Sequence, residues 1–282
     1  MDDFVFVDSS FDQNKTKEYN LSIQLGLDGF SFSILDSNKN CISLNAYTPF
    51  QDKSDSDPIN SFKENLRNST ILNLPFQKVS VLWISQESIL IPSEFFSPEF
   101  AHESYQLCHS LDKSEKLVWN KMKELDSWSV FSIPEAFKDL LESHYSNISL
   151  LHHTFPFLNT SLSQSKLENQ PNVFVNVQKD FFHLIIPNPN RKHFINNFAY
   201  KEDTDLAYYI LNIYKQQKLN NEKSKLILDG IIQEDSKVIQ LLRKYLGQVE
   251  VRNLPSDLRM KDDIPQKEYN QFINLLNLSM CE

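Results

Sequence analysis

Two stretches of this chain have the pattern of the same three-stranded meander. The first, residues 21–49, reads LSIQL, a glycine-flanked turn, FSFSILD, a polar turn and CISLNAYTP. Apolar and polar residues alternate in it with the period of two that is typical of half-buried strands. The second, residues 173–200, reads VFVNV, a turn, FFHLIIP, a polar turn and HFINNFAY. A chain with two such meanders is predicted to fold as two related halves.

Superposing the two stretches tests this repeat. When Leu21 is placed on Val173, Asp28 falls on Asp180, and the apolar residues of the second strands match as well: Phe30 on Phe182, Phe32 on Leu184 and Ile34 on Ile186. One extra residue in the distal turn would then bring Ala46-Tyr47 onto Ala199-Tyr200. Agreement over this length indicates a duplication.

The segments after each meander follow a common order. In the first half, Pro58 is expected to open a helix, and KVSVLWIS at 78–85 has the continuous apolar pattern of a buried strand. In the second half, the Asp203 region caps a helix, 225–228 is a buried strand, and Gly247 ends a further helix. The sequence thus predicts β-β-β-α-β-α twice, in an α/β fold.

The domain boundaries follow from this order. Residues 1–20 are expected to form an N-terminal arm, with an edge strand at 4–7. The first half would span 21–170 and carry an inserted β-rich subdomain at 86–133, in which 116–125 is assigned as a strand, although a helix is also tenable. The polar segment Glu168 to Pro171 is the expected boundary, and 171–282 would form the second half.

Composition excludes several classes of function. The net charge is −9 and the basic residues do not cluster, which argues against a nucleic-acid partner. No segment reaches the roughly 20 apolar residues of a membrane span, so no membrane insertion is expected. Three cysteines without metal-ligand spacing, and a start without the positive charge of a signal peptide, predict a cytoplasmic protein.

Glycine is scarce in this chain. Average usage of about 7% would give roughly 20 glycines, but only Gly26, Gly29, Gly230 and Gly247 occur. Loops that wrap a phosphate need glycine, because the backbone must adopt positive φ and approach the ligand closely. Few positions are left for such loops.

Two halves with this order resemble the actin-like ATPase superfamily of sugar kinases, heat-shock 70 ATPases and actin. The resemblance covers most of residues 20–282 and rests on topology and hydrophobic pattern. It is nearest to the pilus-assembly actin-like proteins and to an uncharacterised bacterial family of unknown function. It implies duplicated ribonuclease-H-like halves with mixed sheets, and a nucleotide held by three loops.

The first of these loops would be the turn after the first strand of the meander. The family has Asp and then Gly there, but this chain has Gln24 and Gly26. Glutamine lacks the charged oxygen that magnesium prefers. Asp28 could substitute for that acid, although an aspartate in a turn is common for conformational reasons alone.

The second and third loops differ from the family pattern as well. The second has Asn176 and Gln178 where the family has Asp and Gly, followed by Asp180 in an ordinary turn sequence. The third retains Gly230 alone, followed by Ile231-Ile232, whose branched side chains would obstruct an adenosine. No catalytic residue, metal or cofactor is therefore expected, and the chain is predicted not to hydrolyse ATP.

Three functions remain compatible with the sequence. The first is a catalytically silent scaffold that binds an unknown protein partner or itself. The alternative is an ATP-binding switch or kinase-like protein that uses ATP and Mg with unorthodox ligands, such as Asp28, Asp180 and Asp229. A small-molecule sensor that uses a cleft between the halves is a third.

Aromatic residues in the insertion are the candidates for partner binding. Trp119, Trp128 and the Phe95-Phe96 pair lie there, and aromatic side chains often dominate interface energetics. Core packing is the competing interpretation for each. His144, His152 and His153 lie close in sequence, but their spacing fits no standard metal-ligand pattern, so structural roles are favoured.

Overall fold

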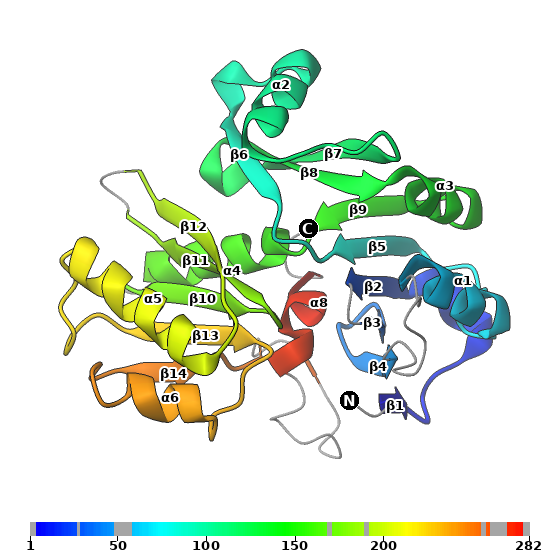
Figure 1. Ribbon diagram of the computed structural model, residues 1–282. Coiled ribbons are helices and arrows are strands. Elements are labelled where there is room, and N and C mark those ends of the chain that lie inside the picture. Colours follow the sequence, from blue (N-terminus) through cyan, green and yellow to red (C-terminus); the bar gives the residue numbers. More distant parts are fainter. Residues whose placement is uncertain are drawn as a thin grey trace. The chain divides into compact units, whose positions relative to one another are not determined.

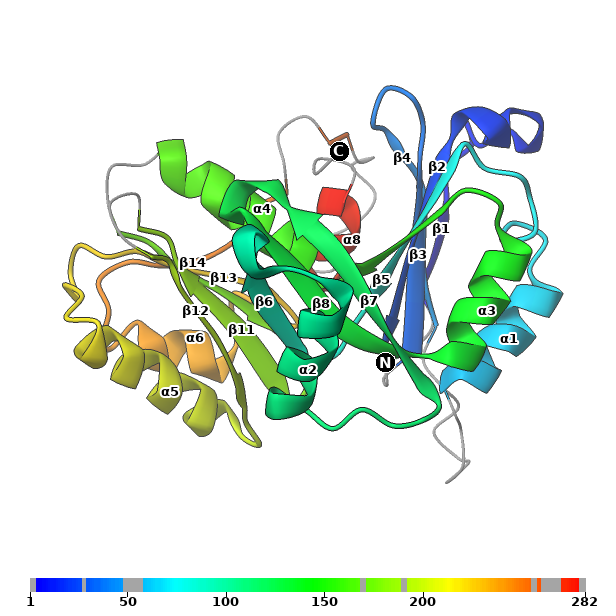
Figure 2. The ribbon, with the colours of Figure 1, turned by 90° about the horizontal axis from the view of Figure 1, so that it is seen from above.

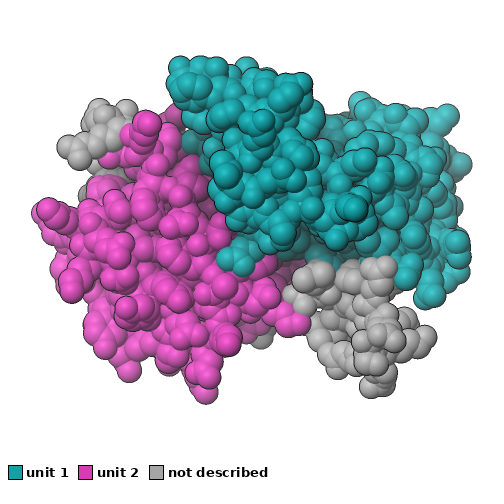
Figure 3. Space-filling model, turned by 45° about the horizontal axis from the view of Figure 1, so that its top comes forward, with its two compact units in different colours: residues 1–155, 256–261 teal, residues 156–255, 262–282 magenta. Residues whose placement is uncertain are grey.

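The structure is a computed structural model that describes residues 4–26, 29–47, 58–167, 171–188, 192–254, 258–259 and 270–278. The chain forms two compact units (Figure 3). Unit 1 comprises residues 1–155 and 256–261, and unit 2 comprises 156–255 and 262–282. The division after Phe155 differs from the boundary expected at 168–171, because the intervening helix belongs with unit 2. None of the described helices is long and apolar enough to cross a membrane.

Unit 1 is built on a six-stranded mixed sheet in the order β1-β4-β3-β2-β5-β9. Its strands are β1 (Phe4–Val7), β2 (Asn20–Gly26), β3 (Gly29–Leu35), β4 (Cys41–Tyr47), β5 (Lys78–Trp83) and β9 (Ile148–His152). Helices α1 (Pro58–Asn68) and α3 (Glu135–His144) lie on the same side of this sheet (Figure 2).

Aromatic rings join these helices to the sheet. Phe62 of α1 contacts Phe30 of β3 edge-on with ring centroids 5.2 Å apart, and it contacts Phe137 of α3 at 5.6 Å. All three rings are buried in one apolar cluster with the inward residues of β2 and β5. The alternation read from the sequence therefore places its apolar side against the two helices.

Residues 4–20 are integrated into unit 1. Strand β1 pairs antiparallel with β4, with Phe4 opposite Ala46, and its Phe side chains are half-buried while Val5 and Val7 are exposed. After the short helix η1 (Gln13–Glu18), Tyr19 is buried in the core of the unit. The predicted edge strand at 4–7 is thus present.

The insertion forms a sheet of its own. Strands β6 (Ser88–Pro92), β7 (Glu115–Met122) and β8 (Ser127–Pro134) pair antiparallel in the order β6-β8-β7. The short helices η2 (Ser93–Phe95) and η3 (Lys123–Leu125) follow β6 and β7. Helix α2 (Pro98–Cys108) packs on the sheet through Ala101 and Tyr105. The strand interpretation of 116–125 is confirmed up to Met122, because β7 pairs with β8 along its whole length, whereas 123–125 form the short helix η3.

Unit 2 has a five-stranded sheet in the order β12-β11-β10-β13-β14 (Figure 1). Its strands are β10 (Val173–Val177), β11 (Phe181–Ile186), β12 (Phe194–Ala199), β13 (Leu226–Gly230) and β14 (Val249–Val251). Its helices are α4 (Thr154–Leu167), α5 (Asp203–Gln216), α6 (Lys237–Leu242), η4 (Asn270–Phe272) and α8 (Ile273–Asn277). Buried residues of α5 and α6 share one apolar cluster with β10, β11 and β13.

Apart from β1, the two sheets repeat the same strand order, and the first two strands of each meander pair in the same register. Ile23 lies opposite Phe32 in unit 1, and Val175 lies opposite Leu184 in unit 2, as the superposition of the two stretches predicts. The third strand differs from the prediction. Ser31 pairs with Ala46, whereas its counterpart His183 pairs with Asn197, two residues before the expected Ala199. A register shift at Ile34/Leu35 adds a residue to the first meander.

Candidate functional site

The position of the first phosphate loop holds no described acid. Gln24 is half-buried on β2, and its partners on the two adjacent strands are Ser31 and Leu82. None of these side chains carries a charge that could hold magnesium. Asp28, the candidate substitute, lies outside the described residues.

Packing explains why a glycine is present at Gly26. A Cβ atom at this position would lie 3.2 Å from the Cβ of Ile84, whose amide donates a hydrogen bond to the Leu25 carbonyl at 2.8 Å. The glycine accommodates the chain leaving β5. Packing against Ile84 is thus a structural reason for a glycine at this position.

In unit 2 the residues of the second and third loops meet on adjacent parallel strands. Asn176 of β10 lies opposite Asp229 of β13, and Val177 lies opposite Gly230. The Asn176 amide nitrogen donates to the Asp229 carboxylate at 2.6 Å, and its amide oxygen accepts from the Gln178 side chain at 2.8 Å. All three side chains are buried. They are bonded to one another rather than directed toward a ligand.

A buried ion pair completes this cluster. One guanidinium nitrogen of Arg252, the residue after β14, lies 3.1 Å from the Asp229 carboxylate, and the two side chains are only 7% and 1% exposed. The two terminal guanidinium nitrogens also donate to the hydroxyls of Thr160 and Ser161 on α4, each at 2.8 Å. The guanidinium carbon lies 5.1 Å from the ring centroid of Phe174. We call Asn176, Gln178, Asp229 and Arg252, with these two hydroxyls, the unit 2 polar cluster.

Burial governs the electrostatics of this cluster. Desolvation raises the pKa of the Asp229 carboxyl above its ordinary value, and the Arg252 charge and the Asn176 hydrogen bond oppose that rise. Desolvation likewise lowers the pKa of Arg252. Each charge is therefore stabilised mainly by the other, and neither can be removed alone without leaving a buried charge.

The sequence reasoning named Asp229 but missed Arg252. The available signal was a basic residue directly after the short strand Val249–Val251, which lies in the sheet next to a strand that ends in Asp229-Gly230. Its partners on α4 are about 90 residues away in the sequence. No local pattern indicates such a contact.

Gly230 is required by the strand pairing itself. Its φ is +90°, and a Cβ atom there would lie 2.1 Å from the Val177 carbonyl oxygen. The same oxygen accepts a hydrogen bond from the Ile231 amide at 2.8 Å. Ile232 is buried and Ile231 is 40% exposed, so bulky side chains follow the glycine directly.

Asp180 occupies a solvent-exposed turn between β10 and β11. Its backbone carbonyl accepts a hydrogen bond from the Tyr200 amide at 2.8 Å, which fixes the turn. The Asp180 side chain is therefore separate from the buried polar cluster, although it lies near in sequence.

The insertion carries a cluster of aromatic rings. Phe96 stacks on Trp128 with centroids 4.2 Å apart and an interplanar angle of 13°, and it meets Trp119 edge-on at 5.9 Å. Trp119 is 37% exposed and the neighbouring Phe95 is 58% exposed. Trp128 is half-buried, with the Lys121 ammonium 6.0 Å from its ring centroid. We call Phe95, Phe96, Trp119 and Trp128 the insertion patch.

The three neighbouring histidines are not gathered into one site. His144 is exposed at the end of α3, whereas His152 and His153 are buried. The ring nitrogens of His152 lie 2.7 Å from the Thr154 hydroxyl and 3.0 Å from the Ser85 carbonyl oxygen. The second contact requires a proton on that nitrogen, so it cannot act as a base toward the Ser85 hydroxyl. Among the described residues, no group of three or more His, Cys, Asp or Glu side chains could hold a metal ion.

The fold is that of the actin-like ATPases. A Bacteroides thetaiotaomicron protein described as having an actin-like ATPase fold and unknown function is similar to this chain with a TM-score of 0.80 and 23% identity, covering 97% of this chain and 100% of that one. A chain of the PilM–PilN type IV pilus biogenesis complex is similar with a TM-score of 0.61 and 12% identity, covering 93% and 97%. These likenesses confirm the fold class predicted from the sequence.

The family follows from residues 8–249, which match the family DUF3822, described as a protein of unknown function. The chain belongs to this family. No curated protein sequence matches it.

Proposed function

We propose that this protein is an actin-like scaffold that binds a protein partner, or a second copy of itself, without using a nucleotide. The observation that carries the proposal is the unit 2 polar cluster. Asp229 is the acid at the third loop position, and its carboxylate is already bonded to Arg252 and Asn176. A magnesium ion or a phosphate there would have to break a buried ion pair, which costs several kcal/mol.

The other loop positions support the same conclusion. Gln24 offers magnesium no charged oxygen. Gly230 is required by its close approach to the Val177 carbonyl, and Gly26 lies against the Ile84 side chain. The glycines that resemble a nucleotide-binding pattern thus have structural reasons to be there.

Mg-ATP binding separates this proposal from the alternative of an ATP-binding switch. We expect no change in melting temperature and no heat of binding on titration with Mg-ATP. A ligand at about 100 times its dissociation constant would add roughly 2.7 kcal/mol to stability, which a melting experiment detects easily. A clear rise in melting temperature with Mg-ATP that disappears in Asp180→Ala would contradict the scaffold proposal and support the ATP-binding switch, because Asp180 is the exposed acid near the second loop.

The insertion patch is the surface proposed to bind the partner. Its exposed member Trp119 is held by its contact with Phe96, so little side-chain entropy is lost when a partner covers it. Aromatic anchors of this kind carry much of the energy of protein interfaces. The similar PilM chain was solved as a complex with PilN, which supports binding of a protein partner.

A single substitution tests this surface. We expect Trp119→Ala to weaken partner binding by about 30-fold, the effect of an interface anchor worth about 2 kcal/mol. Tyr208→Ala is the matched control, because Tyr208 is a 64% exposed aromatic residue of unit 2. Partners are captured from the native host, and self-association is measured by sedimentation equilibrium. Equal binding by both variants, or a large loss of stability in Trp119→Ala, would assign Trp119 to packing instead.

A further inference from the structure

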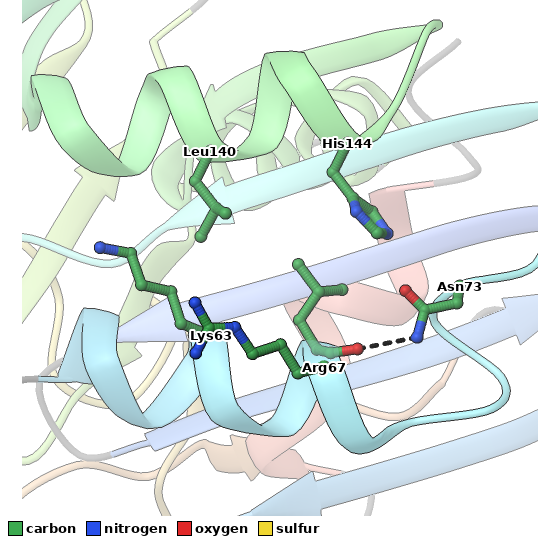
Figure 4. Close-up of a pocket in the computed structure, with 6 residues that line it drawn as sticks. Lys63, Arg67, Asn73, Leu140 and His144 are labelled. Atoms are coloured by element: carbon green, nitrogen blue, oxygen red, sulfur yellow. Dashed lines mark hydrogen bonds between the residues drawn. The ribbon is translucent and has the colours of Figure 1, made fainter.

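Unit 1 has a recess on its helices, apart from the loop positions at the strand ends. It lies between α1 and α3 and has a volume of about 250 Å³. Its walls are formed by Lys63, Leu66 and Arg67 of α1, Asn73 after that helix, and Leu140 and His144 of α3 (Figure 4).

The charge of this recess is unusual for the protein. The chain has a net charge of −9, yet three of the six lining residues are basic and none is acidic. Neither Lys63 nor Arg67 forms an ion pair within the part of the chain that the structure describes. Within the described residues, the charges of Lys63 and Arg67 at this recess are therefore not balanced by an ion pair.

The spacing of the two α1 cations is itself unfavourable. Lys63 and Arg67 are four residues apart on one helix face, and like charges at this spacing destabilise a helix by a few tenths of a kcal/mol. The neighbouring helix shows the favourable arrangement at the same spacing, where Lys138 and Glu142 pair at 2.7 Å. An anion between Lys63 and Arg67 would remove the repulsion.

Helix dipoles account for only part of this arrangement. Arg67 and His144 lie in the last turns of α1 and α3, where the dipole favours cations. Lys63 lies one turn earlier and gains little from the dipole, which falls off within the last turn. Its place beside Arg67 calls for another explanation.

Asn73 adds a hydrogen-bond acceptor. Its amide nitrogen donates to the carbonyl oxygens of Leu66 at 2.9 Å and Ser69 at 2.6 Å, so both amide hydrogens are used. The amide oxygen is left to accept, and it points toward the His144 side of the recess (Figure 4). Leu66 and Leu140 supply apolar walls for a short carbon chain.

We propose that this recess binds the phosphate monoester of a small soluble polyol. Lys63 and Arg67 balance the double charge of the phosphate, and the guanidinium can donate two parallel hydrogen bonds to it. A hydroxyl of the polyol donates to the Asn73 amide oxygen. The volume lies just below the usual range for small-molecule pockets, which suits a ligand of few atoms. The site is independent of the proposed scaffold function.

Calorimetry on the full chain at low ionic strength tests the proposal with glycerol 3-phosphate as the probe. We expect saturable binding that is tighter than that of inorganic phosphate, and no binding of acetate, which carries a single charge. Vesicles containing phosphatidate present the same headgroup from a membrane. Binding to the vesicles alone, or acetate binding as well as the phosphate ester, would overturn the proposal.

Charge-reversal variants locate the site. Lys63→Glu is expected to weaken glycerol 3-phosphate binding at least ten-fold, as loss of a charged hydrogen bond does. Lys215→Glu makes the same change of net charge at an exposed position on α5 and should stay within about two-fold of the wild type. Arg67→Lys keeps the charge but loses the paired hydrogen bonds, so an intermediate loss is expected. Equal weakening in Lys63→Glu and Lys215→Glu, or no saturable binding by the wild type, refutes the site.

Discussion

Substitution of Arg252 by methionine removes the positive charge of the unit 2 polar cluster while keeping an unbranched apolar side chain. The Asp229 carboxylate then remains buried, with the Asn176 amide as its hydrogen-bond donor. The hydroxyls of Thr160 and Ser161 lose the guanidinium as well. We expect Arg252→Met to destabilise the protein by about 3 to 5 kcal/mol, the usual cost of leaving one member of a buried ion pair alone.

Urea denaturation followed by far-UV circular dichroism measures this loss. All three tryptophans, Trp83, Trp119 and Trp128, lie in unit 1, so tryptophan fluorescence reports on unit 1 alone. Circular dichroism also follows the helices of unit 2. The thermal midpoint should fall by roughly 10 °C, since 1 kcal/mol corresponds to about 2 to 4 °C in a chain of this size.

Two further variants make the interpretation specific. Arg243→Met removes an exposed partner of Glu234 and should cost less than about 1 kcal/mol. The double variant Asp229→Leu/Arg252→Met removes both charges, and we expect it to recover at least half of the loss, because apolar pairs can replace buried ion pairs. If Arg252→Met costs no more than Arg243→Met, or if the double variant is less stable than the single one, the ion pair is not what holds this cluster.

Two other predictions follow from glycine geometry and from burial. Gly230→Ala should destabilise the protein by about 3 kcal/mol or more, because the new Cβ would lie 2.1 Å from the Val177 carbonyl oxygen. Gly26→Ala should cost about 1 kcal/mol, because the Ile84 side chain can move away. Equal losses of stability in the two variants, measured by urea denaturation, would contradict this ranking. Burial raises the pKa of the Cys41 thiol from 9.0 to about 12. Below pH 9 the thiol is protonated in both the folded and the unfolded chain. Between pH 9 and pH 12 only the unfolded chain loses the proton. This group therefore lowers the free energy of unfolding by about 1.4 kcal/mol per pH unit in that range. Urea midpoints at pH 9, 10 and 11 should fall less steeply for Cys41→Ala than for the wild type; parallel profiles would show that the thiol does not titrate in this way.

The fold was predictable from the sequence where the apolar pattern of a strand agrees with its pairing register in the sheet. The alternation in 21–35 predicts which residues face the helices, although both faces of these strands are largely buried, and the register Ile23–Phe32 and Val175–Leu184 confirms the superposition. Of the two-residue error in the third strands, one residue came from the shift at Ile34/Leu35 and the other from the extra residue predicted in the second meander. A β-bulge adds one residue to a strand without changing its composition, so superposing the two stretches of sequence does not reveal it.

Helix ends and domain boundaries were harder to predict from the sequence. The polar segment after Leu167 was taken as the boundary, but α4 belongs with unit 2, as the hydrogen bonds of its Thr160 and Ser161 to Arg252 illustrate. The helix expected to run to Leu246 ends at Leu242, because residues 243–246 continue as tight turns. Tertiary contacts decide both cases.

The candidate site was predictable as a set of departures from a family pattern. Gln24, Asn176 and the isoleucines after Gly230 are visible in the sequence. The partners of Asp229 are not visible there, because Arg252 and α4 approach it through three-dimensional packing. Similarly, the sequence alone does not show whether Phe96 and Trp128 stack on each other or are simply exposed to solvent.

The unit 2 polar cluster has a consequence for the order in which the chain is made. Its hydroxyls come from α4 at the start of the unit, and its guanidinium comes from the residue after the last strand. A nascent chain can form β10, β11 and β12 early, but the carboxylate at the end of β13 has no counter-charge until residue 252 has left the ribosome. The second unit is thus expected to close as a whole only after residue 252 has been synthesised.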